Sequence, residues 1–158
     1  DIYPHKVRLI EQNAEKYGVH IINTACSDAS HHIDRLENSF DRIICDVPCS
    51  GLGIIRKKPD IRYKDEKSLA GLPALQASIL ENAASYLKTG GRMIYTTCTI
   101  LPEENENVVR AFLAGHRDFR LVDFSVCGKQ YGGMKTFLPH VDGTDGFFAA
   151  LLERRTAQ

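Results

Sequence analysis

Hydrophobic residues recur along this chain at two spacings, and the alternation between the spacings predicts the order of secondary-structure elements. Residues 5–17 have apolar side chains at helical spacing and are followed by Gly18, a residue that commonly ends helices. A short β-branched run over residues 20–25 and an apolar run over 41–46 are instead typical of strands. The first third of the chain is therefore predicted as one helix and two strands.

The rest of the chain continues the same alternation. Its pattern predicts a helix, a strand, a second helix introduced by Pro102, and two final strands, over residues 68–88, 92–97, 103–114, 119–124 and 146–153. Strands that alternate with helices in this way predict an α/β fold, with a mainly parallel sheet covered by helices on both faces.

Composition places the chain among soluble globular domains, because 43% of its 158 residues are hydrophobic and 25% are charged. Lys and Arg number 20, and so do Asp and Glu, so the chain has no net charge. A protein whose affinity depends mainly on phosphate contacts is usually basic. RNA binding would therefore require a separate basic module or a local cluster, for which residues 56–64 are the candidate.

The cysteines and the apolar runs exclude several other classes. Five cysteines without a C-x-x-C pair argue against a disulfide framework and a zinc site, and they favour a reducing cytoplasm. No apolar run reaches membrane-spanning length, and no signal peptide is visible. We therefore expect neither a metal nor a membrane partner.

Candidate chemistry lies directly after the predicted strands, where parallel sheets bind their ligands. These positions hold Asp28, the segment 46–51 with Asp46 and Cys49, and the segment 97–99 with Cys98. Pro48 stiffens the first cysteine loop, so packing alone explains Cys49 poorly.

Cys98 stands just before a predicted helix start, a place that lowers thiol pKa values, although a structural role explains it equally well. The other cysteines lack such neighbours, and we assign them to packing: Cys26, Cys45 and Cys127.

Three segments in this order are characteristic of a known family. Residues 46–53 read DVPCSGLG, residues 95–99 read YTTCT and residues 102–106 read PEENE. Together they resemble the Sun/RsmB family of rRNA cytosine-5 methyltransferases. Further segments, at 1–6, 56–63 and 138–148, also resemble that family, so the similarity extends over nearly the whole chain.

The resemblance implies a Rossmann-like methyltransferase fold, S-adenosyl-L-methionine as cofactor and RNA as substrate. It implies that Cys98 attacks C6 of the target cytosine and that Cys49 helps to release the product. Asp46 would lie between cofactor and base, Asp1 would bind the ribose, and Asp28 would contact the adenine. We expect 16S rRNA as the target, with tRNA as the alternative.

One part of the family pattern is not found in these 158 residues. The glycine-rich first motif, the first strand and helix, most of the second strand and an N-terminal RNA-binding domain have no counterpart. We therefore expect residues 1–158 to be a partial catalytic domain in which the run over 20–25 lacks its neighbour. We also expect weak or no S-adenosylmethionine binding by this chain alone, which micromolar binding in a calorimetric titration would contradict.

Three alternatives stay open at this point. A DNA cytosine-5 methyltransferase uses the cysteine of its Pro-Cys motif as the nucleophile, whereas this chain has Cys98 as well as Cys49. Amino-methylating enzymes have a second proline where this chain has Cys49. A non-catalytic RNA-binding or assembly module is the third alternative, and an inactive fragment would behave in the same way.

Overall fold

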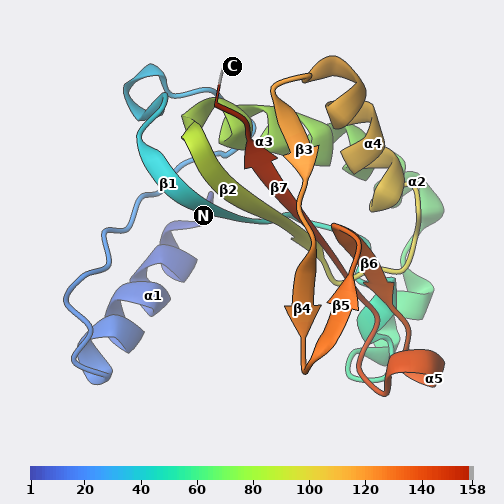
Figure 1. Ribbon diagram of the computed structural model, residues 1–158. Coiled ribbons are helices and arrows are strands. Elements are labelled where there is room, and N and C mark those ends of the chain that lie inside the picture. Colours follow the sequence, from blue (N-terminus) through green and yellow to red (C-terminus); the bar gives the residue numbers. More distant parts are fainter. Residues whose placement is uncertain (157–158) are drawn as a thin grey trace.

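The computed structural model describes residues 1–156, in which a mixed five-stranded sheet lies against two helices (Figure 1). The predicted domain includes residues 157 and 158, which lie outside the described residues. Four strands of the sheet follow the order β1 (Phe40–Asp46), β2 (Leu87–Thr97), β7 (Phe147–Arg154) and β3 (Phe119–Leu121). The fifth strand, β6 (Met134–Phe137), also pairs with β7. The predicted α/β class is therefore confirmed.

The strand directions differ from the mainly parallel sheet that the alternation predicts. Strands β1 and β2 are parallel, but β7 is antiparallel to β2, β3 and β6. For the β6–β7 pair the reason lies in the connection, which contains only the short helix α5 (Pro139–Asp142) and a few further residues. A parallel neighbour would require a crossover of a dozen or more residues.

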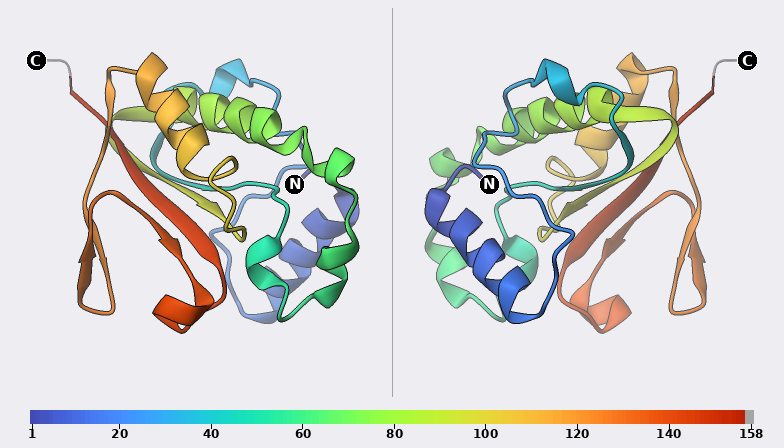
Figure 2. Two further views of the ribbon diagram at one scale, coloured as in Figure 1. Left: turned by 90° about the vertical axis from the view of Figure 1, so that its right-hand side faces the viewer. Right: turned by 90° about the vertical axis from the view of Figure 1, so that its left-hand side faces the viewer.

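Helices cover only one face of the sheet among the described residues. Helices α3 (Leu72–Tyr86) and α4 (Glu106–Gly115) lie together on that face (Figures 1 and 2). Helix α1 (Pro4–Lys16) lies beside the sheet, and Val7 is its one buried residue. On the other face, Ile44 of β1 is 80% exposed. The expected second layer of helices is therefore not present in this part of the chain.

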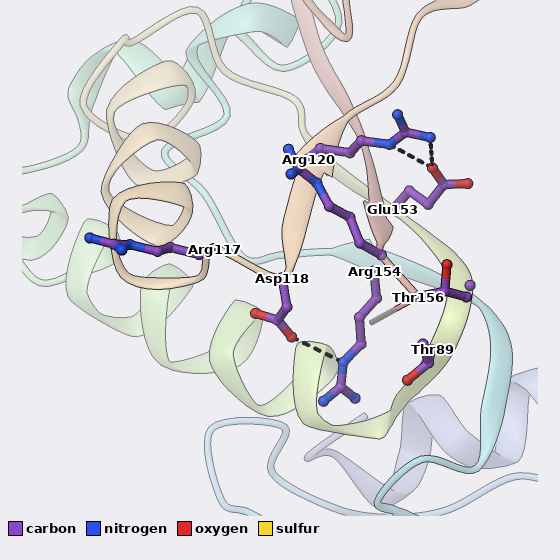
Figure 3. Close-up of a pocket in the computed structure, with 9 residues that line it drawn as sticks. Thr89, Arg117, Asp118, Arg120, Glu153, Arg154 and Thr156 are labelled. Atoms are coloured by element: carbon purple, nitrogen blue, oxygen red, sulfur yellow. Dashed lines mark hydrogen bonds and ion pairs between the residues drawn. The ribbon is translucent and has the colours of Figure 1, made fainter. Parts of the chain in front are cut away.

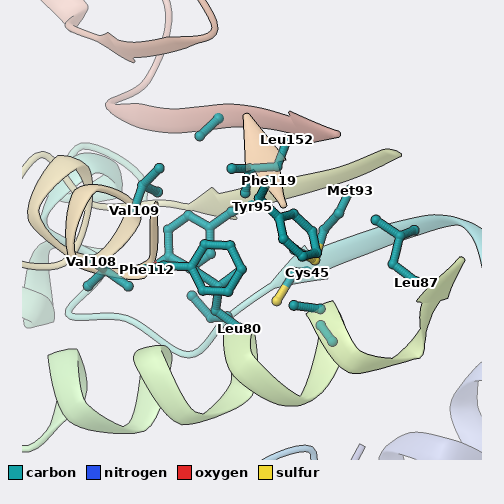
Figure 4. Close-up of a cluster of buried hydrophobic side chains, with 14 of the residues drawn as sticks. Cys45, Leu80, Leu87, Met93, Tyr95, Val108, Val109, Phe112, Phe119 and Leu152 are labelled. Atoms are coloured by element: carbon teal, nitrogen blue, oxygen red, sulfur yellow. The ribbon is translucent and has the colours of Figure 1, made fainter. Parts of the chain in front are cut away.

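The hydrophobic core lies between the sheet and helices α3 and α4 (Figure 4). Side chains alternate between the two faces of a strand, so β1, β2 and β7 each direct every second residue into this core. Burial of large apolar side chains stabilises the layer by roughly 1.5–3 kcal/mol for each one. The core cluster includes Cys45, Leu80, Leu87, Met93, Tyr95, Val109, Phe112, Phe148 and Leu152.

Several elements differ in their bounds from the predicted ones. The helix predicted over 68–88 is divided into α2 (Glu66–Leu69) and α3, with Pro73 in the first turn of α3. Helix α4 begins at Glu106, later than predicted, because residues 102–105 form turns. Residues 20–25 form no strand, since an isolated run has no partner for its backbone hydrogen bonds.

The remaining elements are short. A hairpin of β4 (Phe124–Val126) and β5 (Lys129–Tyr131) extends beyond the main sheet (Figure 1). Three 3₁₀ turns also occur: η1 (Asp34–Leu36), η2 (Leu52–Ile54) and η3 (Pro59–Tyr63). Within residues 1–156, no helix has the length and apolar character that crossing a membrane requires.

A candidate active site with two adjacent cysteines

The loops that follow β1 and β2 bring two cysteines into contact. Cys49 Sγ and Cys98 Sγ lie 3.2 Å apart, and both side chains are half-buried. The contact arises because β1 and β2 are neighbouring parallel strands, so their carboxyl ends meet at one edge of the sheet. The two segments predicted to follow strands therefore lie together.

The loop that carries Cys49 is held rigidly along its length. The backbone N–H of Val47 donates to Thr96 O (3.2 Å), and Gln76 Nε2 donates to Pro48 O (2.9 Å). Just beyond Cys49, the hydroxyl groups of Ser50 and Thr99 lie 2.7 Å apart and are buried. The loop is thus hydrogen-bonded to β2 and α3 through its backbone and to the loop that carries Cys98 through the side chain of Ser50.

A buried carboxylate, Glu104, connects the two cysteine loops. Its Oε2 accepts from the backbone N–H of Ser50 (2.9 Å) and from Gln76 Nε2 (2.8 Å). Tyr95 donates its hydroxyl to the backbone carbonyl of Glu104 (2.7 Å), and only 2% of Glu104 is exposed.

In the sequence, Glu104 is one of several polar residues of the segment 102–106. The run of polar residues at 102–106 was the one local indication that Glu104 has a role. Nothing near it in the sequence indicates the hydrogen bond between Glu104 and Ser50, which is 54 positions away.

The loop that carries Cys98 has its own buried support. Thr97 Oγ1 donates to Asn105 Oδ1 (2.5 Å), and Asn105 Nδ2 donates to Thr99 O (3.1 Å). The carbonyl of Cys98 accepts from the backbone N–H of Gly53 (3.0 Å). Cys98 therefore follows a strand end, as predicted, but α4 starts only at Glu106. The helix after Cys98 thus begins three residues later than the predicted start at residue 103.

The two thiols differ from the other cysteines in their surroundings. Burial raises the pKa of the Cys49 thiol, and its hydrogen bond with Cys98 adds to that effect, so Cys49 holds its proton at neutral pH. Cys45 lies in the core as predicted, where burial raises its pKa to about 12. Cys26 and Cys127 are exposed instead of packed, because Cys26 lies in the unpaired segment after α1 and Cys127 in the β4–β5 turn.

The three predicted carboxylates lie at the end of β1 and in two segments that contact each other. Asp46 ends β1 and accepts from Thr96 Oγ1 (3.0 Å). Asp28 Oδ1 accepts from the Ser30 hydroxyl (2.7 Å) and backbone N–H (2.8 Å), and these bonds lower the pKa of Asp28. The carbonyl of Asp1 accepts from the backbone N–H of Ser27 (3.1 Å), so the segments that carry Asp1 and Asp28 are neighbours.

A pocket of about 370 Å³ lies along the free edge of β1. Ala29, the residue after Asp28, and Asp46 both line it, together with apolar residues of β1 and α3. The pocket therefore combines an apolar wall with one carboxylate, that of Asp46, and with the side chain of Arg42. No group of His, Cys, Asp and Glu residues within 1–156 has the arrangement of a metal site.

The basic segment after the Cys49 loop is joined to the loop before β7. Asp145 accepts from Arg56 Nη2 (3.0 Å) and Lys57 Nζ (2.5 Å), and Gly146 N–H donates to Gly53 O (2.8 Å). Two of the cations in the candidate RNA-binding segment are thus already paired. Tyr63, the aromatic residue of that segment, is 82% exposed.

The match with known proteins covers almost the whole chain. Residues 1–153 fit the family model described as 16S rRNA methyltransferase RsmB/F. The chain belongs to the RsmB/F family. This assignment confirms the family that the sequence segments predict.

Individual relatives agree with the RsmB/F assignment. The probable ribosomal RNA small subunit methyltransferase B of Bacillus subtilis is 39% identical over 165 residues, which cover 98% of this chain and 37% of that protein. The corresponding protein of Serratia proteamaculans is 47% identical over 117 residues, 73% of this chain and 27% of the relative. The chain therefore spans well under half the length of these RsmB relatives.

A solved structure shows the same fold. NSun6 from Pyrococcus horikoshii, determined with SFG, superposes with a TM-score of 0.81 at 26% identity, over 99% of this chain and 41% of that one. SFG is an analogue of S-adenosylmethionine. The S-adenosylmethionine-dependent O-methyltransferase of Thermotoga maritima shares the fold of the RsmB/F chain, with a TM-score of 0.50 at 16% identity, and the predicted Rossmann-like fold class is confirmed.

Proposed function

We propose that this chain carries the catalytic residues of an S-adenosylmethionine-dependent RNA cytosine-C5 methyltransferase that acts on 16S rRNA. The observation that carries the proposal is the 3.2 Å contact between Cys49 Sγ and Cys98 Sγ at the carboxyl ends of two parallel strands. Membership of the RsmB/F family supports methylation of 16S rRNA. The partial catalytic domain expected from the sequence would thus contain both thiols.

The two thiols are suited to different steps. Cytosine C5 is a poor nucleophile until a thiolate adds to C6, so the proposal assigns that attack to Cys98. The S–C6 bond forms as the electrons of the C5=C6 bond move to C5, which then takes the methyl group. With the assistance of Cys49 the C5 proton passes to solvent, the electrons of the C5–H bond form the C5=C6 double bond again, and the S–C6 bond breaks as Cys98 leaves as a thiolate. A buried thiol that holds its proton at neutral pH is poorly suited to the attack at C6, which requires a thiolate.

The carboxylates would position the base and the cofactor. Bound S-adenosylmethionine supplies an electrophilic methyl group. Asp1 and Asp28 present acceptor oxygens of the kind that ribose hydroxyls and the adenine amino group require, and Asp46 would accept from the edge of the cytosine. The target base must leave its stack to reach the thiols, because C5 and C6 are inaccessible inside a helix.

Replacement of each cysteine by alanine tests the proposal in the protein that carries this chain. We expect Cys98→Ala to abolish methyl incorporation into 16S rRNA. We expect Cys49→Ala to accumulate a protein–RNA adduct that survives a denaturing gel, since attack proceeds while release fails. Cys127→Ala is the matched control, because this exposed cysteine lies in the β4–β5 turn, and it should leave methylation unchanged.

Other outcomes would separate the alternatives. Absence of any adduct with Cys49→Ala, together with an adduct in Cys98→Ala, would assign the attack to Cys49, as in the DNA enzymes. Methylation of tRNA transcripts but not of 16S rRNA would replace the proposed substrate. Binding of RNA without any methyl transfer by the unaltered protein would favour a non-catalytic module.

A further inference from the structure

Ser50, the residue directly after Cys49, has all of its polar groups paired. Its backbone N–H donates to Glu104 Oε2 (2.9 Å), its carbonyl accepts from Lys64 Nζ (2.9 Å), and its hydroxyl lies 2.7 Å from Thr99 Oγ1. Ser50 is fully buried, so none of these groups can exchange its partner for water without cost. Three segments far apart in the sequence thus fix one residue beside a thiol.

The contact between the hydroxyl groups of Ser50 and Thr99 joins the two cysteine loops at equivalent places. Each hydroxyl belongs to the residue directly after a cysteine, Cys49 in one loop and Cys98 in the other. Both hydroxyl-bearing residues are fully buried within residues 1–156, so their contact does not depend on any further part of the protein. The bond therefore spans the loops one position beyond the sulfur pair, whose atoms lie 3.2 Å apart.

Cys98 has supports that do not involve the hydroxyl of Ser50. Its carbonyl accepts from the backbone N–H of Gly53 (3.0 Å), and the next carbonyl, that of Thr99, accepts from Asn105 Nδ2 (3.1 Å). Asn105 is fully buried as well. Loss of the Ser50 hydroxyl therefore loosens the loop of the other thiol, while Cys98 keeps these bonds.

The proposed reaction requires a fixed separation between the two sulfurs. Cys98 bonds to C6 of the base, and Cys49 assists at C5, the neighbouring atom of the same ring. While the covalent adduct exists, Cys98 fixes the position of the ring, so the position of Cys49 decides how fast the C5 proton is removed. A displacement of about 1 Å can slow such a step by roughly 100-fold.

We propose that Ser50 and Thr99 are positioning residues that hold Cys49 against Cys98 for release of the RNA adduct. Both hydroxyls are buried, so they act through the backbone next to each thiol and not by contact with RNA. This inference rests on the proposed function, because it takes the two thiols as the catalytic pair. It goes beyond that function because it assigns control of one step to a pair of buried hydroxyls.

Removal of the Ser50 hydroxyl tests the inference in the protein that carries this chain. In Ser50→Ala both backbone bonds of this residue remain, so we expect the fold and the attack at C6 to be kept. Release should slow about tenfold, so that a protein–RNA adduct accumulates on a denaturing gel although both cysteines are present. A loss of folded protein would instead lower adduct formation and methyl transfer together.

The partner hydroxyl supplies a second, independent variant. Thr99→Val removes the same contact and should also accumulate the adduct, whereas Thr99→Ser keeps a hydroxyl and should release RNA at the normal rate. Only Thr99→Val also removes the acceptor of the Leu101 N–H (3.3 Å), so an effect common to Ser50→Ala and Thr99→Val identifies the shared contact. The double variant should slow release about tenfold, because two losses that act through one bond are not additive.

Thr89→Val is the matched control for Thr99→Val. Thr89 lies near the start of β2, at the opposite end of this strand from Cys98, and lines a hollow of about 860 Å³ (Figure 3). The side chain of Thr89 is exposed and its hydroxyl forms no hydrogen bond within residues 1–156. Its replacement should leave adduct formation and release unchanged.

Release at the normal rate in both Ser50→Ala and Thr99→Val would overturn the inference. Adduct formation that falls in parallel with methyl transfer in both variants would assign the hydroxyls to the fold alone and would also overturn it. The proposed function fails separately, if Cys49→Ala forms no adduct with RNA. A trapped adduct in Cys49→Ala, with none in either hydroxyl variant, would refute the positioning role and leave the proposed function intact.

Discussion

Replacement of Glu104 by alanine tests whether the buried carboxylate stabilises the two cysteine loops. The substitution removes the acceptor of the Ser50 backbone N–H (2.9 Å), and Ser50 is fully buried, so that donor loses its partner without access to water. Gln76 Nε2 loses one of its two acceptors but keeps Pro48 O (2.9 Å). The main loss is therefore at the loop that carries Cys49.

The magnitude follows from these contacts. A hydrogen bond to a charged group contributes about 1.5–3 kcal/mol, and an unsatisfied buried donor costs about 1–3 kcal/mol. Relief from the burial of a carboxylate offsets part of this sum. We expect a loss of about 3 kcal/mol in the free energy of unfolding, which lowers the Tm of a protein of this size by roughly 10 °C.

Urea unfolding followed by circular dichroism measures this change, and Glu103→Ala is its matched control. Glu103 is exposed and adjacent, so its replacement should alter the free energy of unfolding by less than about 0.5 kcal/mol. Glu104→Gln keeps an acceptor oxygen for Ser50 and should lose less than Glu104→Ala. Equal stability of the Glu104→Ala and Glu103→Ala variants would refute the stabilising role of Glu104.

Two further predictions concern the same site. Gly53→Ala should destabilise the protein by about 1–3 kcal/mol in thermal unfolding and lower methylation, because the added Cβ would overlap Gly146 O. Gly115→Ala is the control, since the space around Gly115 is open. Equal Tm values for the two variants would contradict the contact between Gly53 and Gly146. At pH 8, Cys49 should react with iodoacetamide at least about tenfold more slowly than exposed Cys127, because its raised pKa leaves less thiolate. Its alkylation rate should rise with pH, and peptide mass spectrometry measures both rates. Equal alkylation rates for the two cysteines would show that the Cys49 thiol is not protected.

Local pattern was sufficient for the features of the site that lie within or directly after an element. The strands β1 and β2 were predicted from their apolar runs, and the position of the two cysteine loops follows from the rule that parallel strands present their carboxyl ends together. The contact between Cys49 and Cys98 was therefore accessible from the sequence.

Features that depend on tertiary packing were not accessible in this way. The bond from Ser50 to Glu104 joins residues 54 positions apart, and no periodicity encodes it. Residues 20–25 have the composition of a strand, but pairing decides whether a strand forms. The exposure of Cys26 and Cys127 likewise depends on the elements that surround them, whereas residue type alone favours burial.

The close approach of Gly53 and Gly146 restricts how this protein can be redesigned. Their backbones touch, and a Cβ on Gly146 would lie 2.6 Å from Gly53 Cα. A library that varies the loop after Cys49 without the loop before β7 would therefore sample mostly misfolded members. A redesign of the target base should vary residues 51–57 and 143–147 together while keeping both glycines. The two loops are joined by the hydrogen bond from Gly146 to Gly53 and by the ion pair of Arg56 with Asp145.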